Sequence, residues 1–378
     1  MDLECDILVL GAGAAGLALT ARLTGSTRPQ RRVVLADAQP DPLAGRAWAY
    51  WSARRTALDA AVSARWSRLV VVAGGRRLEL DPGPYDYRLV RGEDLAALVE
   101  PAARRSGVVR LTGAVHALED GPDVVRLAVG DVAVRARWVL DSRPPPPPRP
   151  DEVRLRFLGR QVRTGRPVFD PACATLMDFS VRAPGEVRFC YLLPTAPDTA
   201  LVEVAALAAG SATREDLSTT LDDYLAGVVG APAVEVLRQE AGDLPLRRPG
   251  PRRAGHRVLR VGCAGGMLKP STGYAFDRIV RDADAVVGSL DRHGHPWALP
   301  PRHRRHLWLD QVLLDVVRDD PGAIEPAFAR MFARNPAARV LRFLDEDTRL
   351  PEELRLIAGL TPGPFLRTVR NRILPGHR

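Results

Sequence analysis

The sequence has very little lysine and few cysteines. Lys269 is the only lysine in 378 residues, so the net charge of +9 comes almost entirely from arginine. The arginines are scattered, whereas a nucleic-acid-binding protein needs a basic stripe with interleaved aromatic residues, so we predict no nucleic-acid partner. The four cysteines lie far apart without a C-x-x-C pair. We expect buried thiols in a reducing compartment, and neither a disulfide framework nor a metal site.

Long hydrophobic runs are also missing. No window reaches about 18 consecutive apolar residues, the length expected of a membrane-spanning helix. The residues before the first predicted strand, Met1 to Cys5, are too few and too acidic for a signal peptide. We therefore expect a cytoplasmic protein. A peripheral place on the inner face of the cell membrane stays open, because positive charge attracts anionic lipid.

The most informative motif lies near the start of the chain. Residues 6–10 form an apolar run typical of a buried strand, and Gly11, Gly13 and Gly16 follow as G-x-G-x-x-G before a helix that includes Ala15. The first glycine permits a tight turn, the second lets backbone approach a pyrophosphate, and the third lets the helix pack close to the strand. The helix N-terminus then offers free N–H groups to the phosphates.

An acid follows at a distance that suits a dinucleotide site. Asp37 comes directly after the second predicted strand, residues 32–36, and lies 26 residues beyond Gly11. A carboxylate at this place can bind a ribose hydroxyl. Strand, glycine turn, helix, strand and acid together predict that the first 150 residues begin a dinucleotide-binding domain of Rossmann type.

The rest of the chain suggests a second, β-rich region and a helical end. We expect residues 39–51 to form a loop whose rings, Trp48, Tyr50 and Trp51, either line a pocket or anchor the loop on the core. Five prolines at 144–148 predict a stiff connector. Strands are expected at 68–80, 108–125, 132–141, 153–162, 176–179, 186–193, 199–206 and 257–261, and helices at 90–105, 214–237, 276–290 and from 299 onward with a break at Pro336.

Several later motifs resemble the flavin-dependent lycopene cyclase family. They are FLGRQVRT (157–164), LMDFS (176–180), FCYLLP (189–194), LVE (201–203) and KPSTGYAF (269–276). Four further segments also fit the family, namely RAWAYW (46–51), YRLVRGEDL (87–95), WVLDSRP (138–144) and RVLRFLDEDT (339–348). The resemblance runs nearly end to end and keeps the order of the motifs.

The resemblance implies an α/β fold: a Rossmann-like FAD-binding fold of the aromatic-hydroxylase type with a β-sheet substrate domain and C-terminal helices. On this reading, residues 1–150 and 256–298 form a discontinuous FAD-binding domain, 151–255 the substrate domain and 299–378 the helical region. It implies FAD in the reduced form, without net redox change and with NAD(P)H as an external reductant, and no metal. The cofactor-binding residues implied are Gly11, Gly13, Ala15, Gly16, Asp37, Arg46, Arg88, Asp141, Gly262, Gly266, Gly273 and Tyr274.

Family members protonate a terminal double bond of a linear polyene, close a ring through a carbocation and lose a proton. The partner implied is therefore a lipophilic isoprenoid. Protonating an alkene needs a general acid in a dry site, where burial raises the pKa of a carboxyl. Glu203, in an apolar strand with Leu201 and Ala205, is the predicted acid, although a Glu facing solvent would fit the pattern too. Asp178, between Met177 and Phe179, is a second candidate that is either catalytic or structural.

One departure from the family leaves the substrate open. Residues 204–209 after Glu203 are all apolar, where family members usually carry a further acid. The site is either reshaped for another linear isoprenoid or acts on lycopene with one carboxylate. A monooxygenase or other redox flavoenzyme is the main alternative, although GCAGGMLKP (262–270) lacks the aspartate usual in hydroxylases of this fold. A non-catalytic FAD-binding protein is a third. The arginine-flanked apolar helices at 306–317 and 327–345 could lie on a membrane surface.

Overall fold

The first sheet forms around a strand that is apolar on both faces. The computed structural model describes residues 3–25, 31–144, 147, 149, 151–210, 212–360 and 362–373. Continuous apolar sequence suits the centre of a parallel sheet that is covered on both sides. The strand order is β8–β2–β1–β11–β10–β9, with β17 pairing beside β11. The bounds are β1 Leu3–Leu10, β2 Val33–Asp37, β8 Val109–Thr112, β9 Val115–Asp120, β10 Val125–Val129, β11 Val132–Asp141 and β17 Val258–Arg260.

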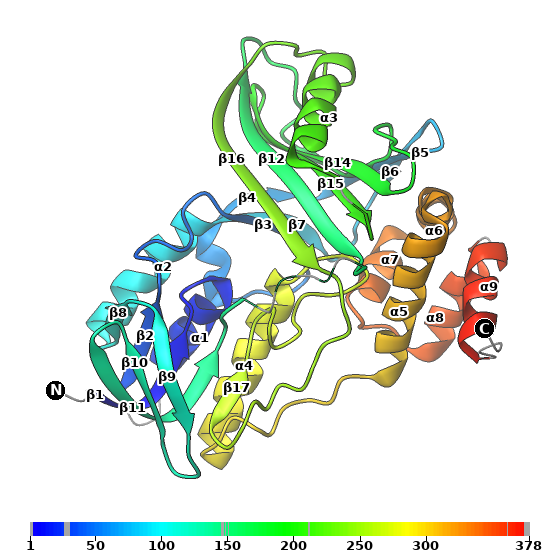
Figure 1. Cartoon of the computed structure of the whole chain (residues 1–378). Helices are drawn as coiled ribbons and strands as arrows, with labels where there is room; N and C mark the ends of the chain where they lie inside the picture. The colour runs from blue at the N-terminus through cyan, green and yellow to red at the C-terminus, as the bar shows by residue number, and fades with distance from the viewer. Residues whose placement is uncertain are drawn as a thin grey trace.

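Three helices accompany this sheet. Their bounds are α1 Ala14–Thr24, α2 Gly92–Arg105 and α4 Phe276–His293. Side chains of α1 and α4 pack with Ile7 and Val9 of β1 in one hydrophobic cluster. The strand–turn–helix–strand unit at the start of the chain is thus present, and Figure 1 shows α1 and α4 side by side next to this sheet. Strands β1, β2 and β11 are parallel, so their carboxyl ends lie at the same edge of the sheet, where α1 begins.

The second sheet is larger and supplies the other half of the site. Its order is β16–β12–β15–β14–β13–β5–β6. The bounds are β5 Arg68–Ala73, β6 Arg76–Leu80, β12 Arg154–Thr164, β13 Cys173–Asp178, β14 Val187–Ala196, β15 Thr199–Ala208 and β16 Val234–Pro245. Strands β5 and β6 come from the first 150 residues but pair here. The helix predicted over 214–237 is therefore wrong in its last part, because α3 (Arg214–Gly227) ends early and residues 234–237 pair with β12.

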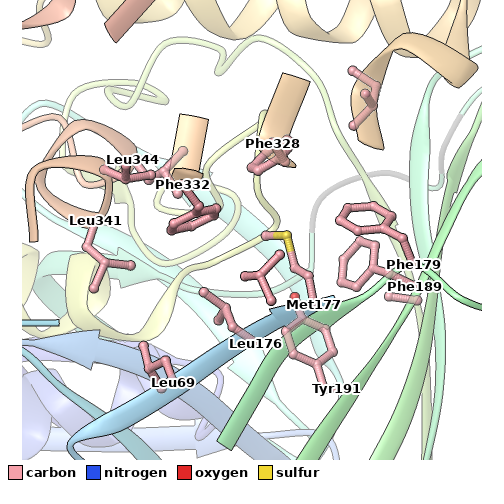
Figure 2. Close-up of a cluster of buried hydrophobic side chains, with 14 of the residues drawn as sticks. Leu69, Leu176, Met177, Phe179, Phe189, Tyr191, Phe328, Phe332, Leu341 and Leu344 are labelled. Atoms are coloured by element: carbon pink, nitrogen blue, oxygen red, sulfur yellow. The ribbon is translucent and has the colours of Figure 1, made fainter. Parts of the chain in front are cut away.

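Each face of this second sheet packs against different partners. Val202 and Val204 of β15 face α3, with Tyr224 in the same cluster. Leu201 and Ala205, which alternate with them, face the opposite way and join the main hydrophobic cluster. Figure 2 shows that cluster: Met177, Phe189 and Tyr191 from the strands, and Phe179 directly after β13, pack with Phe328, Phe332, Leu341 and Leu344 from the C-terminal helices. Alternation along the strands thus gives the sheet an α3 face and an inner face.

A third, short sheet corrects the loop predicted for residues 39–51. Residues Ala47–Ser52 form β3, which pairs with β7 (Asp86–Arg91), and β7 also pairs with β4 (Val62–Trp66). The large rings of this segment fit a strand, in which Tyr50 lies opposite Arg88. Trp48 and Tyr50 pack on Phe276, and Trp51 packs on Tyr274. The short helix η1 (Ala57–Ala61) connects β3 to β4.

The C-terminal region is helical, as predicted, with the expected break at Pro336. Its helices are α5 Arg304–Asp319, η2 Pro321–Ala323, α6 Ile324–Arg334, α7 Ala337–Leu344, α8 Leu350–Ala358 and α9 Pro362–Ile373. The single lysine connects this region to the rest: buried Lys269 Nζ donates to Asp310 Oδ1 and Glu346 Oε1, each at 2.8 Å. Among the described residues, no helix is both long and apolar enough to cross a membrane. Three prolines of the predicted connector, Pro145, Pro146 and Pro148, lie outside the described residues.

Candidate functional site

The glycine turn has the geometry that its sequence implies. Gly11 adopts φ +91°, and a Cβ there would lie 2.5 Å from Ser142 Oγ. A Cβ on Gly16 would overlap the Gly11 carbonyl oxygen, so helix α1 and strand β1 approach too closely for any other residue. Gly13, the N-cap of α1, has no atom within 4 Å of its Cβ position. Two glycines are therefore required by packing, and the third faces open space at a helix N-terminus.

Asp37 holds this turn in place. Its Oδ2 accepts a hydrogen bond from the Ala12 N–H at 2.6 Å, and its Oδ1 accepts one from the Gln39 N–H at 2.9 Å. The carboxylate thus sits at the end of β2, beside the glycine turn.

One cavity joins the glycine turn to the second sheet. It encloses about 420 Å³ and is mainly apolar in lining. Six of the residues predicted from the sequence lie on its wall: Gly13, Ala15, Arg46, Glu203, Gly273 and Tyr274. Residues 150 or more positions apart therefore meet around one space, which is bordered by both the glycine turn and an acid.

Glu203 is one of two acids on the wall of this cavity. Strand β15 places it opposite Gly159 of β12 on one side and Tyr191 of β14 on the other. Burial raises the pKa of Glu203 well above its usual value, and the charge of nearby Glu240 raises it further. Within the described residues no hydrogen bond reaches its carboxyl group. Both effects favour the protonated form of Glu203, and its side chain lies on the cavity wall.

Glu240, a second acid on the cavity wall, was missed by sequence reasoning. Strand β16 places it opposite Gly159, on the side away from Glu203. Its Oε2 accepts a hydrogen bond from the Ala47 N–H at 2.9 Å. Burial raises the pKa of Glu240 to about 7, against the opposing effects of Arg238, the Ala47 N–H and Arg46. Glu240 could have been identified from the sequence only if the segment that forms β16 had been predicted as a strand.

Three tyrosines form a wall next to Glu203. Tyr87, Tyr191 and Tyr274 all line the cavity, and the hydroxyl oxygens of Tyr87 and Tyr274 are hydrogen-bonded at 2.9 Å. Burial raises the pKa of all three phenols well above the usual value, so they stay neutral. The ring of Trp51 packs on Tyr274 with the centroids 4.5 Å apart. Electron-rich aromatic faces of this kind attract a cation.

Two predicted charged residues lie away from the cavity wall. Arg88 is 1% exposed and forms ion pairs with Asp86 at 2.7 Å and Asp59 at 3.2 Å. Asp141, at the end of β11, pairs with Arg143 at 2.8 Å. In this structure both residues brace the strands on which they lie.

The three predicted glycines of the second glycine-rich segment lie in three different environments. A Cβ on Gly262 would lie 2.8 Å from Ala15 Cβ, so this glycine lets the turn after β17 contact the start of α1. Gly266 packs against Pro249 and Arg302, away from the cavity wall. Gly273, at φ +74°, lies on the wall, where its chain reversal presents Tyr274.

Asp178 lies on the α3 face, not on the cavity wall. Its Oδ2 accepts a hydrogen bond from Tyr224 OH at 2.9 Å, and its Oδ1 accepts one from the Ser180 N–H at 3.0 Å. Both oxygens are thus satisfied, which is the geometry of the structural alternative for this acid. Within the described residues, no group of three or more histidine, cysteine or acidic side chains could hold a metal ion.

Solved structures share this architecture. A geranylgeranyl bacteriochlorophyll reductase-like protein from Thermoplasma acidophilum aligns with a TM-score of 0.62 at 13% identity, covering 99% of both chains. PqsL of Pseudomonas aeruginosa, a probable FAD-dependent monooxygenase, aligns with a TM-score of 0.59 at 18% identity, covering 91% of this chain and 100% of its own. The predicted fold class, a Rossmann-like FAD-binding fold of the aromatic-hydroxylase type with a β-sheet domain and C-terminal helices, is confirmed.

Sequence comparison places the chain more narrowly. It is 28% identical to a lycopene beta-cyclase of a Paracoccus species, over 97% of this chain and 96% of that one. It is 29% identical to a lycopene beta-cyclase of Pseudescherichia vulneris, over 95% of both. The model of the family described as lycopene cyclase protein matches residues 6–370. The chain therefore belongs to the lycopene cyclase family.

Proposed function

We propose that this protein is an FAD-dependent carotenoid cyclase that closes a ring on the end of lycopene or another linear polyprenyl substrate. The reaction is started by a proton and leaves the oxidation state unchanged. The observation that carries this proposal is the placement of Glu203: a carboxyl whose pKa is raised by burial lies on the wall of a mainly apolar cavity that also borders the glycine turn at the start of α1. The relatives named lycopene beta-cyclase support it.

The residues around the glycine turn at the start of α1 fit FAD. The open space at Gly13, where a Cβ would meet nothing within 4 Å, leaves room for a pyrophosphate at the N-terminus of α1. Gly13 and Ala15 would contact the phosphates, Asp37 would hold the turn and bind the ribose, and the Gly273–Tyr274 segment would contact the ring system. When bound in reduced form, FAD supplies negative charge near the substrate.

The chemistry assigned to the protein's own residues is proton transfer and cation stabilisation. The O–H bond of Glu203 breaks as its proton adds to the terminal alkene, whose π electrons form the new C–H bond. A second double bond closes the ring on the resulting cation, and the faces of Tyr87, Tyr191 and Tyr274 stabilise the positive charge. A proton then leaves a carbon next to the cation. The product is an isomer of the substrate.

The substrate's solubility suggests a place for the protein at a membrane surface. Leu350 and Leu354 of α8 are 55% and 58% exposed and lie one helical turn apart, next to exposed Arg349 and Arg355. We propose that this face attaches loosely to anionic membranes. In liposome flotation, the bound fraction should fall as salt rises, because screening weakens exposed charge attraction. No flotation at low salt with anionic lipid would reject this attachment.

The test of function is expression in cells that accumulate lycopene, and separately with shorter prenylated compounds, followed by mass analysis. A cyclase gives a product of unchanged mass, and in heavy water one solvent deuterium is added to the ring carbon formed from the attacked alkene. A monooxygenase would instead add the mass of an oxygen atom and consume NAD(P)H stoichiometrically. Product without deuterium would exclude proton-initiated cyclisation.

A further inference from the structure

Gly159 lies between the two acids of the cavity. It pairs with Glu203 through β15 and with Glu240 through β16, so both carboxyl side chains project from the same face of three adjacent strands. A Cβ on Gly159 would lie 3.0 Å from Glu203 Oε2 and 3.2 Å from Glu240 Cγ. The two side chains thus lean toward each other over the one position that lacks a side chain. Gly159 also belongs to the FLGRQVRT segment, to which sequence analysis gave no role.

The two acids have different surroundings. Glu203 faces Tyr191 of β14, Tyr87 of β7 and Tyr274, all of them neutral. Glu240 accepts the Ala47 N–H of β3 and lies 4.0 Å from Arg238 Nη2, which in turn pairs with Glu93 of α2 at 3.2 Å. Exposed Arg46 also acts on Glu240. Glu240 is therefore the member of the pair whose charge is stabilised, and it lies on β16, the edge strand of the sheet.

We propose that Glu203 and Glu240 act as one proton-sharing pair over Gly159, with Glu240 returning a proton from solvent to Glu203 after each cyclisation. The inference rests on the proposed function. When Glu203 has given its proton to the alkene, the O–H bond of Glu240 breaks and its proton restores the Glu203 acid. The Glu240 carboxylate, held by the Ala47 N–H and Arg238, then takes a proton from water. The proton lost by the substrate cation goes to water, so the balance closes.

This pair supplies the second acid that the residues after Glu203 do not provide. Two carboxyls in one low-dielectric site resist being ionised together, so the pair retains at least one proton at neutral pH. Burial raises the pKa of Glu240 to about 7, which suits a group that must both accept and release a proton near neutral pH. Glu240 acts through Glu203, because it restores the proton that Glu203 gives to the substrate. It is therefore a positioning residue.

The decisive variant is Glu240→Gln, because the amide oxygen can still accept the Ala47 N–H bond. We expect kcat to fall at least about tenfold, less than a full general-acid loss because water can replace part of the relay. KM and flavin content should stay unchanged. In the wild type, kcat should fall as pH rises through about 7, where Glu240 loses its proton, and this fall should disappear in the variant. Wild-type kcat with an unchanged pH profile would overturn the proposal.

The matched control is Glu235→Gln. Glu235 lies on the same strand, carries the same charge and forms an exposed ion pair with Arg163 at 3.1 Å. This variant should leave kcat and its pH profile as in the wild type. If it changes both in the same way as Glu240→Gln, a general charge effect on β16 replaces the proposal.

Gly159→Ala provides a second test that keeps both acids. Its backbone is not in the left-handed region, and the added methyl group lies between the carboxyl side chains. Separating them should lower kcat and reduce the coupling between their titrations. This variant decides the matter if Glu240→Gln does not fold: coupled titration and full kcat in Gly159→Ala would reject the pair.

Infrared titration of the protonated carboxyl bands in the resting protein separates this inference from the proposed function. In Glu240→Gln, the band of Glu203 should lose its proton at lower pH than in the wild type, because the neighbouring negative charge is gone. An unchanged midpoint would reject the pair even in an active enzyme. A wild type that does not cyclise lycopene or any shorter prenyl substrate would reject the function, while the shifted midpoint would still establish the pair.

Discussion

The two faces of the second sheet each hold buried acids, but they treat them differently. On the α3 face, both oxygens of Asp178 accept hydrogen bonds, from Tyr224 OH and the Ser180 N–H. On the inner face, Glu203 lies among neutral rings and beside a second acid. Donors stabilise a carboxylate, whereas burial without donors stabilises the protonated acid. The supply of hydrogen-bond donors, more than burial itself, distinguishes the surroundings of Asp178 from those of Glu203.

Glu203→Gln gives the largest difference between the two faces. The amide keeps the size of the side chain but has no acidic proton, so cyclisation should fall by about 10²–10⁴-fold or more. Flavin content and melting temperature should stay near those of the wild type. Product formation is measured in lycopene-accumulating cells and with purified protein. If more than about a tenth of the activity remains, the donor is another group.

Gly13→Val tests whether the cyclisation proposed for the inner face depends on the cofactor proposed at the glycine turn. A side chain at this position projects into the space assigned to the pyrophosphate. We expect purified protein without flavin absorbance and without cyclisation, while the α3 face remains intact. Near-ultraviolet circular dichroism checks the packing of the aromatic residues. Full flavin absorbance in this variant would contradict the assignment of the turn.

The buried acids on the inner face should make the free energy of unfolding depend on pH. The pKa of Glu240 is raised from 4.5 in the unfolded chain to about 7 in the folded protein. The folded state therefore binds this proton more tightly, and stability is lost as pH rises from about 4.5 through about 7. At about 1.4 kcal/mol per pH unit, the loss is of the order of 3 kcal/mol. Denaturant unfolding of wild type and Glu240→Gln should show a smaller loss in the variant.

Asp178→Asn should give the smallest effect on activity. Its oxygens bind Tyr224 and Ser180 on the face away from the cavity, so we expect cyclisation to stay within a few-fold of the wild type. Stability should fall by about 1–3 kcal/mol, because two hydrogen bonds to a buried acceptor are disturbed. Tyr224→Phe is the matched change on the donor side and should lower stability similarly. An activity loss in Asp178→Asn as large as that of Glu203→Gln would remove the distinction between the faces.

Local patterns predicted the parts of the site that depend on neighbours in sequence. Gly16 is required by its contact with Gly11 within one strand–turn–helix unit, and Gly11 by its φ of +91°, so spacing alone identifies both, although a Cβ on Gly11 would also meet the distant Ser142. The apolar alternation around Glu203 likewise predicts the face on which it lies. The placement of Gly16 and Glu203 thus follows from short-range geometry.

Long-range pairing explains what the sequence did not predict. The helical pattern of α3 was extended to residue 237, and β16 was lost because its strand identity comes from pairing with β12. Glu240 was lost with it. In the same way, the sequence pattern predicts a loop over residues 39–51, whereas pairing with β7 makes Ala47–Ser52 a strand. Arg88 and Asp141 form ion pairs with Asp86 and Arg143, and their cofactor role stays a prediction.

The burial of Lys269 makes the contact between the loop that connects β17 to α4 and the C-terminal helices observable by chemical labelling. An acylating reagent needs a free, unprotonated amine, and this amine is only 4% exposed and is held by Asp310 and Glu346. Since no other lysine competes, the acylation of a single peptide containing Lys269 measures how often α5 and the segment after α7 move away. The rate of that one modification, compared with and without a polyene, would report whether substrate entry separates the helices from the loop.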